Sequence, residues 1–74
     1  MHDGKTPTAA PTIPGWRLII SDRGRFWAIR INAFPRAALR AGAEPTVDAD
    51  TFAEVREAVA VQEEKARVAV EGVS

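Results

Sequence analysis

The most constraining feature of this sequence is a pair of apolar segments on either side of a short polar stretch. In WRLIISDRGRFWAIRI, β-branched and aromatic residues flank Ser-Asp-Arg-Gly-Arg, a composition typical of a β-hairpin. We expect Asp22 and Arg23 to form a type I turn and Gly24 to take a left-handed conformation, because glycine has no Cβ to clash there. Ser21 then faces Arg25, and this loop fixes the register of the two strands.

This register assigns the hairpin side chains to two faces. The predicted cross-strand pairs are Ile20–Phe26, Leu18–Ala28 and Trp16–Arg30 on one face, and Ile19–Trp27 and Arg17–Ile29 on the other. We expect the first face to pack against a helix, with the guanidinium of Arg30 reaching solvent at the edge of the sheet. The second face then points outward, and it is too apolar to be explained by contact with water alone.

The second strong signal is an amphipathic helix from about Phe52 to Glu71. Thr51, followed three residues later by Glu54, forms a capping-box pattern, and Gly72 is suited to end the helix. A three-four spacing places one stripe of side chains on the same side of this helix: Phe52, Val55, Val59, Gln62, Ala66 and Ala69. Such a helix is about 30 Å long, whereas strands of six or seven residues cover about 20 to 23 Å. We therefore expect the helix end to extend beyond the sheet and to contact another molecule.

The region between the hairpin and the long helix allows more than one interpretation. In AFPRAALRAGAEP, Pro35 can start a short helix that ends before Gly42, or the segment can be a loop. Segment 45–49, PTVDA, can form a third strand at the sheet edge or remain irregular. The sequence therefore predicts an α+β fold of the ββα type, a β-hairpin packed on one long C-terminal helix, with a third edge strand left open.

The N-terminal segment 1–14 differs in composition from the rest of the chain. It holds three prolines, and Ile13 is its only large aliphatic residue after Met1. We predict a disordered tail over 1–14 and a single domain over 15–72. The longest apolar runs are far shorter than the roughly 20 residues that span a bilayer, and the N-terminus lacks the apolar core of a signal peptide. We therefore expect a soluble, cytoplasmic protein with no membrane association.

The residue types also limit the chemistry. The chain has no cysteine and one histidine, His2, which leaves no thiol nucleophile, no zinc cluster and no Ser-His-Asp relay. No glycine-rich phosphate loop is present. Asp48, Asp50 and Glu54 precede or open the helix, where capping and the helix dipole explain them better than a metal does. We expect no enzyme activity, no cofactor, no metal and no small-molecule substrate.

Charge is segregated along the chain, although the formal net charge is zero. Residues 1–43 hold seven Lys and Arg against two Asp and Glu, and residues 44–74 hold three against eight. The basic hairpin favours an alternative function, a nucleic-acid-binding module accessory to DNA transactions, whose cationic and aromatic side chains contact phosphates and bases. The residues predicted for this role are Arg17, Arg23, Arg25 and Trp27. The zero net charge argues against tight binding of nucleic acid.

The main hypothesis is a non-catalytic protein-interaction module. Tryptophan is enriched among the anchors of protein interfaces, and Trp27 is predicted to lie on the outward face of the hairpin. The expected partner is another protein or a second copy of the chain, bound through the outer hairpin face and the helix end. The predicted partner-binding residues are Ile19, Trp27, Ile29, Ala66, Ala69 and Val70.

Two segments, GWRLIISDRGRFWAIR and TVDADTFAEVREAVAVQEE, resemble a group of small uncharacterised actinobacterial proteins. The shared features are a tryptophan, an SD-x-GR turn, a WA-x-R strand and a DADT helix start, over roughly residues 15 to 64. This resemblance supports the domain boundaries and implies no activity. The chain is also similar to the AP2-like arm-binding domains of phage-type integrases, which place a twisted sheet over one helix. The AFPRAALRAGAEP insertion and the acidic helix differ from that pattern.

Overall fold

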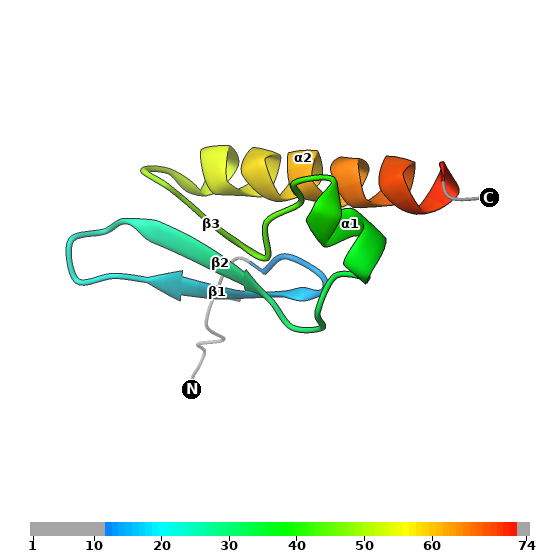
Figure 1. Cartoon of the computed structure of the whole chain (residues 1–74). Helices are drawn as coiled ribbons and strands as arrows, with labels where there is room; N and C mark the ends of the chain where they lie inside the picture. The colour runs from blue at the N-terminus through cyan, green and yellow to red at the C-terminus, as the bar shows by residue number, and fades with distance from the viewer. Residues whose placement is uncertain (1–11, 73–74) are drawn as a thin grey trace, which may run out of the picture.

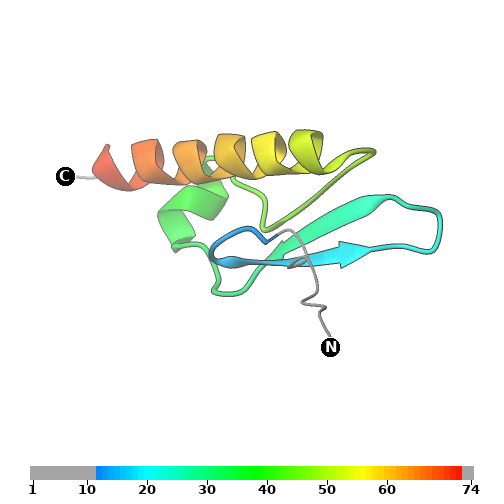
Figure 2. The ribbon, with the colours of Figure 1, turned by 180° about the vertical axis from the view of Figure 1, so that it is seen from behind.

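A three-stranded antiparallel sheet and two helices make up the fold (Figure 1) in a computed structural model that describes residues 12–72. The elements are β1 (Trp16–Ile20), β2 (Phe26–Arg30), α1 (Arg36–Arg40), β3 (Thr46–Ala49) and α2 (Phe52–Glu71). The strand order is β1-β2-β3, so β1 and β3 are the edges of the sheet. From both sides, α2 lies along one face of the sheet, and α1 packs beside its second half (Figures 1 and 2). The predicted α+β fold is confirmed, and the third strand is present.

The hairpin has the register that its turn predicts. All the cross-strand pairs between Trp16–Ile20 and Phe26–Arg30 match the expected ones. Gly24 has a φ of 81°, in the left-handed region that glycine adopts without strain. Its amide donates to the carbonyl of Ser21 at 2.8 Å, and the amide of Ser21 donates to the carbonyl of Arg25 at 2.9 Å. The hairpin faces are therefore set by local turn chemistry.

The region that the sequence leaves open contains both a helix and a strand. Pro35 precedes α1, and its φ of −57° suits the position before the first helical turn. The helix ends in a Schellman motif: the amide of Gly42 donates to the carbonyl of Leu39 at 3.1 Å, and that of Ala43 to Ala38 at 3.0 Å. This ending requires the φ of 97° at Gly42, which directs the chain back to form β3 beside β2.

The long helix α2 has the predicted bounds and the predicted buried side. The hydroxyl of Thr51 accepts the amide of Glu54 at 3.1 Å, which satisfies one of the free N–H groups at the helix start. Gly72 is the C-cap, with a right-handed φ of −79°. Along the predicted stripe, four side chains are buried and the two at its ends are half-buried: Val55, Val59, Gln62 and Ala66, then Phe52 and Ala69.

The core lies between the sheet and the helices and is built mostly from small side chains. Its largest buried side chains are Trp16 and Phe34, whose rings meet edge to face with centroids 6.1 Å apart. The other buried apolar residues are Ile13, Ala28, Ala38, Ala43, Val47, Val55, Val59 and Ala66. Within the described part of the chain, neither helix is both long enough and apolar enough to cross a bilayer.

Ile13 places the start of the fold earlier than the sequence predicts. It is 6% exposed and forms an isolated bridge with Trp16, whose amide donates to the Ile13 carbonyl at 3.0 Å. The predicted domain start at Gly15 is therefore too late, because one isoleucine between two prolines is enough to bring the chain onto the core. The rest of the predicted disordered tail, residues 1–11, lies outside the described residues.

Candidate interaction surface

The face of the sheet opposite α2 carries an exposed apolar patch. Ile19, Trp27 and Ile29 are 42%, 38% and 38% exposed, and β1–β2 pairing places Ile19 directly beside Trp27. We call these three residues the outer patch. Both helices lie on the other side of the sheet (Figure 2), and the three side chains are exposed. A contiguous group of large apolar side chains at a protein surface is typical of an interaction site.

Polar side chains border the outer patch on both sides. On β3, Thr46 and Asp48 lie next to Ile29 and Trp27. On β1, Arg17 lies opposite Ile29. Protein–protein interfaces commonly have an apolar centre and a polar rim of this kind.

The basic residues predicted for nucleic-acid contact do not form one free patch. Arg25 donates to Asp48 at 2.7 Å and forms a second ion pair with Asp50. The hydrogen bond with Asp48 is the main reason that the pKa of the Arg25 guanidinium is raised. Arg23 is exposed in the turn, whereas Arg17 lies toward the other end of the hairpin. One of the three predicted cations, Arg25, is therefore already paired with two carboxylates.

The structure corrects the predicted contact at the helix end. Ala66 is 6% exposed and belongs to the core, and it lies near Phe34 and Pro35, just before α1. Ala69 is half-buried and borders a groove on α2 together with Val61, whereas Val70 lines a different surface. Ala66 and Val70 thus line one surface depression and Ala69 borders another, so the three residues predicted at the helix end do not form one binding surface.

The groove on α2 is a second, weaker candidate surface. It is shallow and open, and its apolar lining is Ala41, Ala60, Val61, Val68 and Ala69. Three charged side chains interrupt that lining: Glu57, Glu64 and Lys65. Glu64 also forms an ion pair with Arg67, which lowers the pKa of the Glu64 carboxyl. The outer patch has no such charges among its three members, so it is the better candidate.

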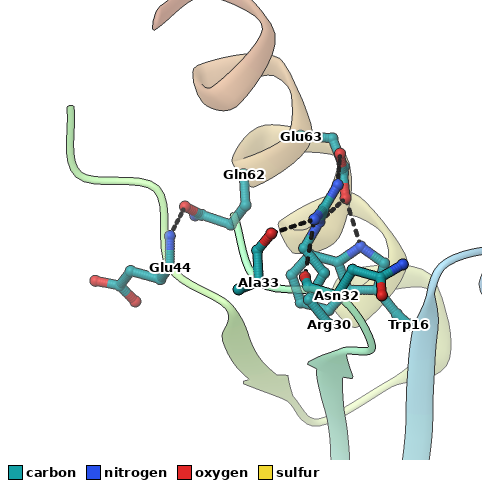
Figure 3. A network of polar contacts seen from close by, with 7 residues as sticks. All are labelled: Trp16, Arg30, Asn32, Ala33, Glu44, Gln62 and Glu63. Atoms are coloured by element: carbon teal, nitrogen blue, oxygen red, sulfur yellow. Dashed lines mark hydrogen bonds and ion pairs between the residues drawn. The ribbon is translucent and has the colours of Figure 1, made fainter. Parts of the chain in front are cut away.

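A polar network joins the sheet to α2 on the core-facing side (Figure 3). We call Trp16, Arg30 and Glu63 the clasp. The carboxylate of Glu63 accepts the indole N–H of Trp16 at 2.7 Å and the Nε–H of Arg30 at 2.8 Å. Arg30 also donates to the carbonyl of Asn32 at 2.9 Å, and its guanidinium lies 4.2 Å from the ring centroid of Phe34. Arg30 was predicted to reach solvent at the sheet edge, and it does so only in part, since its side chain is 23% exposed and is held in the clasp.

The clasp holds Glu63 in its ionised form. The hydrogen bond from Arg30, followed by that from Trp16, lowers the pKa of the Glu63 carboxyl below its ordinary 4.5 against the opposing effect of desolvation. A carboxylate occupied by two donors is poorly placed to accept a proton from a substrate, and we interpret the clasp as a structural device. The sequence contained one signal for it: Arg30 lies on the core-facing side, where a cation requires an acidic partner on the facing helix.

A second contact of the same kind involves Gln62, the polar member of the buried stripe. Its Oε1 accepts the amide of Glu44 at 2.9 Å (Figure 3). This bond satisfies a polar side chain that is 9% exposed and ties the segment before β3 to the middle of α2.

Comparisons with known proteins leave the function to be inferred from this surface. No family model, no curated protein and no solved structure matches the chain. The resemblances to small actinobacterial proteins and to AP2-like domains stay predictions. Over residues 12–72, no group of three His, Cys, Asp or Glu side chains could hold a metal ion.

Proposed function

We propose that this chain is a non-catalytic interaction module that binds a protein through the outer patch, with the cytoplasm as its compartment. The observation that carries the proposal is the one-sided cover of the sheet. The helices bury one face and leave Ile19, Trp27 and Ile29 exposed on the other. Covering these side chains with a partner removes apolar surface from water, which is the main favourable contribution to protein association.

The residue types of the outer patch support this function. Tryptophan is among the residues that most often dominate binding energy, and Trp27 lies on the central strand of the sheet. Side chains on paired strands are held in place before binding, so less conformational entropy is lost when a partner binds. The rim cation Arg17 lies beside this patch and can orient a partner that carries negative charge.

The nucleic-acid alternative has less support from the same surface. Contact with phosphates requires cations that are free to replace counterions. Arg25 is paired with Asp48 and Asp50, and these carboxylates place negative charge at the β3 side of the face. We therefore keep protein binding as the proposed function.

Photocrosslinking from the outer patch tests the proposal. In the full chain, expressed in its source cell, a photoreactive phenylalanine analogue replaces Trp27. The matched control carries the same analogue in place of Leu39, an apolar residue of α1 that is 47% exposed. We expect position 27 to yield a discrete protein adduct that position 39 does not yield, whether the adduct is a second copy or another protein.

Equal labelling from positions 27 and 39 would show that the outer patch is not a docking surface. Thermal unfolding of both variants is measured alongside. Because Trp27 is exposed, we expect the variant at this position to unfold near the wild-type temperature. A variant that is unfolded would also contradict the proposal, since Trp27 would then serve the fold rather than binding.

A further inference from the structure

The outer edge of β1 presents backbone groups that have no strand partner among the described residues. The amide of Ser21 donates across the hairpin to Arg25, and in an antiparallel pair such residues alternate along the strand. The N–H and C=O groups of the odd-numbered residues of β1 therefore point toward β2, and those of Leu18 and Ile20 point away from it. Within residues 12–72, β2 is the only strand that pairs along the length of β1.

The turn that precedes β1 limits this free edge to a short window. The amide of Trp16 donates to the carbonyl of Ile13, and the two residues form a bridge. The chain at Ile13 thus occupies the edge beside Trp16. Among the described residues, what remains free is a set of four groups, the N–H and the C=O of Leu18 and of Ile20.

The window, which spans Leu18–Ile20, is apolar on both faces of the sheet. Ile19 is 42% exposed on the outer face, and Ile20 is 52% exposed on the inner face, where α2 packs on β2 and β3. Natural edge strands are usually protected by a lysine, a proline or a bulge, and the stretch Leu18–Ile20 contains none of these. The edge therefore combines free hydrogen-bonding groups with uncovered apolar side chains.

We propose that β1 pairs antiparallel with β1 of a second copy, about a two-fold axis at Ile19. In this register Leu18 of each copy faces Ile20 of the other, so the four free groups of each copy form four hydrogen bonds in total. Ile19 lies beside Ile19 of the second copy, and Ile20 gains Leu18 as a neighbour. The two sheets become one, and the two outer patches join across the seam. This inference rests on the proposed function, because the pairing joins the outer patches of two copies into one larger surface.

The window is self-complementary, which favours a second copy over an unrelated strand. A two-fold axis at Leu18 would instead place Ile20 against Trp16 of the second copy, where Ile13 already lies. The axis at Ile19 also separates the Arg17 cations of the two copies by about 13 Å along the strands, beyond the screening length of about 8 Å at physiological salt. The zero net charge of the chain removes overall repulsion between copies.

Amide hydrogen exchange and sedimentation equilibrium of the full chain, over a range of concentrations, test this pairing. We expect the mass to double as the concentration rises, and the amides of Leu18 and Ile20 to become protected with the same midpoint. Asp48 is the internal control. Its amide points outward from β3, the opposite edge, because the amide of Arg30 donates to the carbonyl of Pro45, and it should stay unprotected.

Two substitutions at Ile20 separate the backbone from the side chain. Ile20→Pro removes the outward N–H without removing a bond to β2, and Ile20→Thr shortens the apolar side chain but keeps the N–H. We expect Ile20→Pro to raise the dimer Kd at least about tenfold above that of Ile20→Thr, since two of the four bonds are lost.

A wild-type chain that stays monomeric would overturn the proposal, as would a dimer in which Leu18 and Ile20 exchange freely. If Ile20→Pro fails to fold, protection of the Leu18 and Ile20 amides in the wild-type chain tests the pairing instead. Neither negative result would prevent position 27 from crosslinking to another protein. Failure of this pairing is therefore distinguishable from failure of the proposed function.

Discussion

At the scale of single residues, Glu63 joins α2 to two strands of the sheet. Its carboxylate binds Trp16 from β1 and Arg30 from β2, which are 47 and 33 positions away in the sequence. These bonds favour the ionised form of Glu63, so the stability of the fold is coupled to its protonation.

We expect Glu63→Gln to lower the free energy of unfolding at pH 7 by about 1 kcal/mol, a modest loss because water screens a partly exposed ion pair. The folded-state pKa of Glu63 lies below its ordinary 4.5, so its contribution is present above that value and is lost as the pH falls through the folded pKa. Urea unfolding at pH 7 and pH 3 should therefore show a smaller acid loss in Glu63→Gln than in wild type. Glu57→Gln, on the exposed side of the same helix, is the control. An acid loss equal to that of wild type would contradict this role.

The conformation of a residue was predictable where its neighbours in the sequence determine it, and contacts between residues distant in the sequence were not. Gly24 was found from the sequence because a turn of this length needs a positive φ at one position, whatever the rest of the chain does. The clasp could not be found in this way. Its donors and its acceptor become neighbours only after the hairpin and α2 have packed, and several glutamates of α2 were equally available by sequence.

At the scale of elements, α1 packs beside the part of α2 that extends past the strands, so the length of α2 does not by itself indicate a partner. The comparison of lengths predicted a helix that extends past the strands, and α2 does so (Figure 1). The space beside its second half is filled by α1, with Ala38 fully buried. A helix of five residues is too short to be stable alone, so its formation depends on this packing, and the sequence pattern left it undecided.

Truncation after Lys65 is expected to destabilise the fold, because the end of α2 contributes to the core and is not only a contact for another molecule. It removes Ala66 from the core and uncovers the side of α1 that packs on α2. The loss should be at least about 1 kcal/mol, the order of burying one small apolar side chain. Thermal unfolding by circular dichroism measures it, with a chain that ends at Glu71 as the control. Identical midpoints for the two chains would show that α1 does not depend on the end of α2.

For the whole molecule, folding brings the basic and the acidic parts of the chain together. The ion pairs of Arg25 with Asp48 and Asp50, and of Arg30 with Glu63, each join residues 1–43 to residues 44–74. Some of the cations in residues 1–43 therefore pair with carboxylates in residues 44–74 of the same chain. Composition alone does not show whether these charges pair within the chain or bind a charged partner.

We expect no saturable binding of a short duplex DNA at low salt, because the pairing of Arg25 leaves too few free cations on the hairpin. Fluorescence anisotropy with a labelled duplex, at low and at physiological salt, measures the affinity. The double variant Asp48→Asn and Asp50→Asn frees Arg25 and should bind more tightly than wild type. Wild-type binding with a log-log salt slope near −0.9 per phosphate contact would restore the nucleic-acid hypothesis.

The clasp leads us to expect an order of events in folding. The β1–β2 hairpin closes through one tight turn, and hairpins of this kind form in about 1 to 10 μs. The bond between Trp16 and Glu63 closes a far longer loop, which costs more chain entropy and requires β1, β2 and α2 to be in place. We therefore expect the indole of Trp16 to reach its final surroundings late, and in a chain whose Trp27 is replaced by phenylalanine its fluorescence would report that late step.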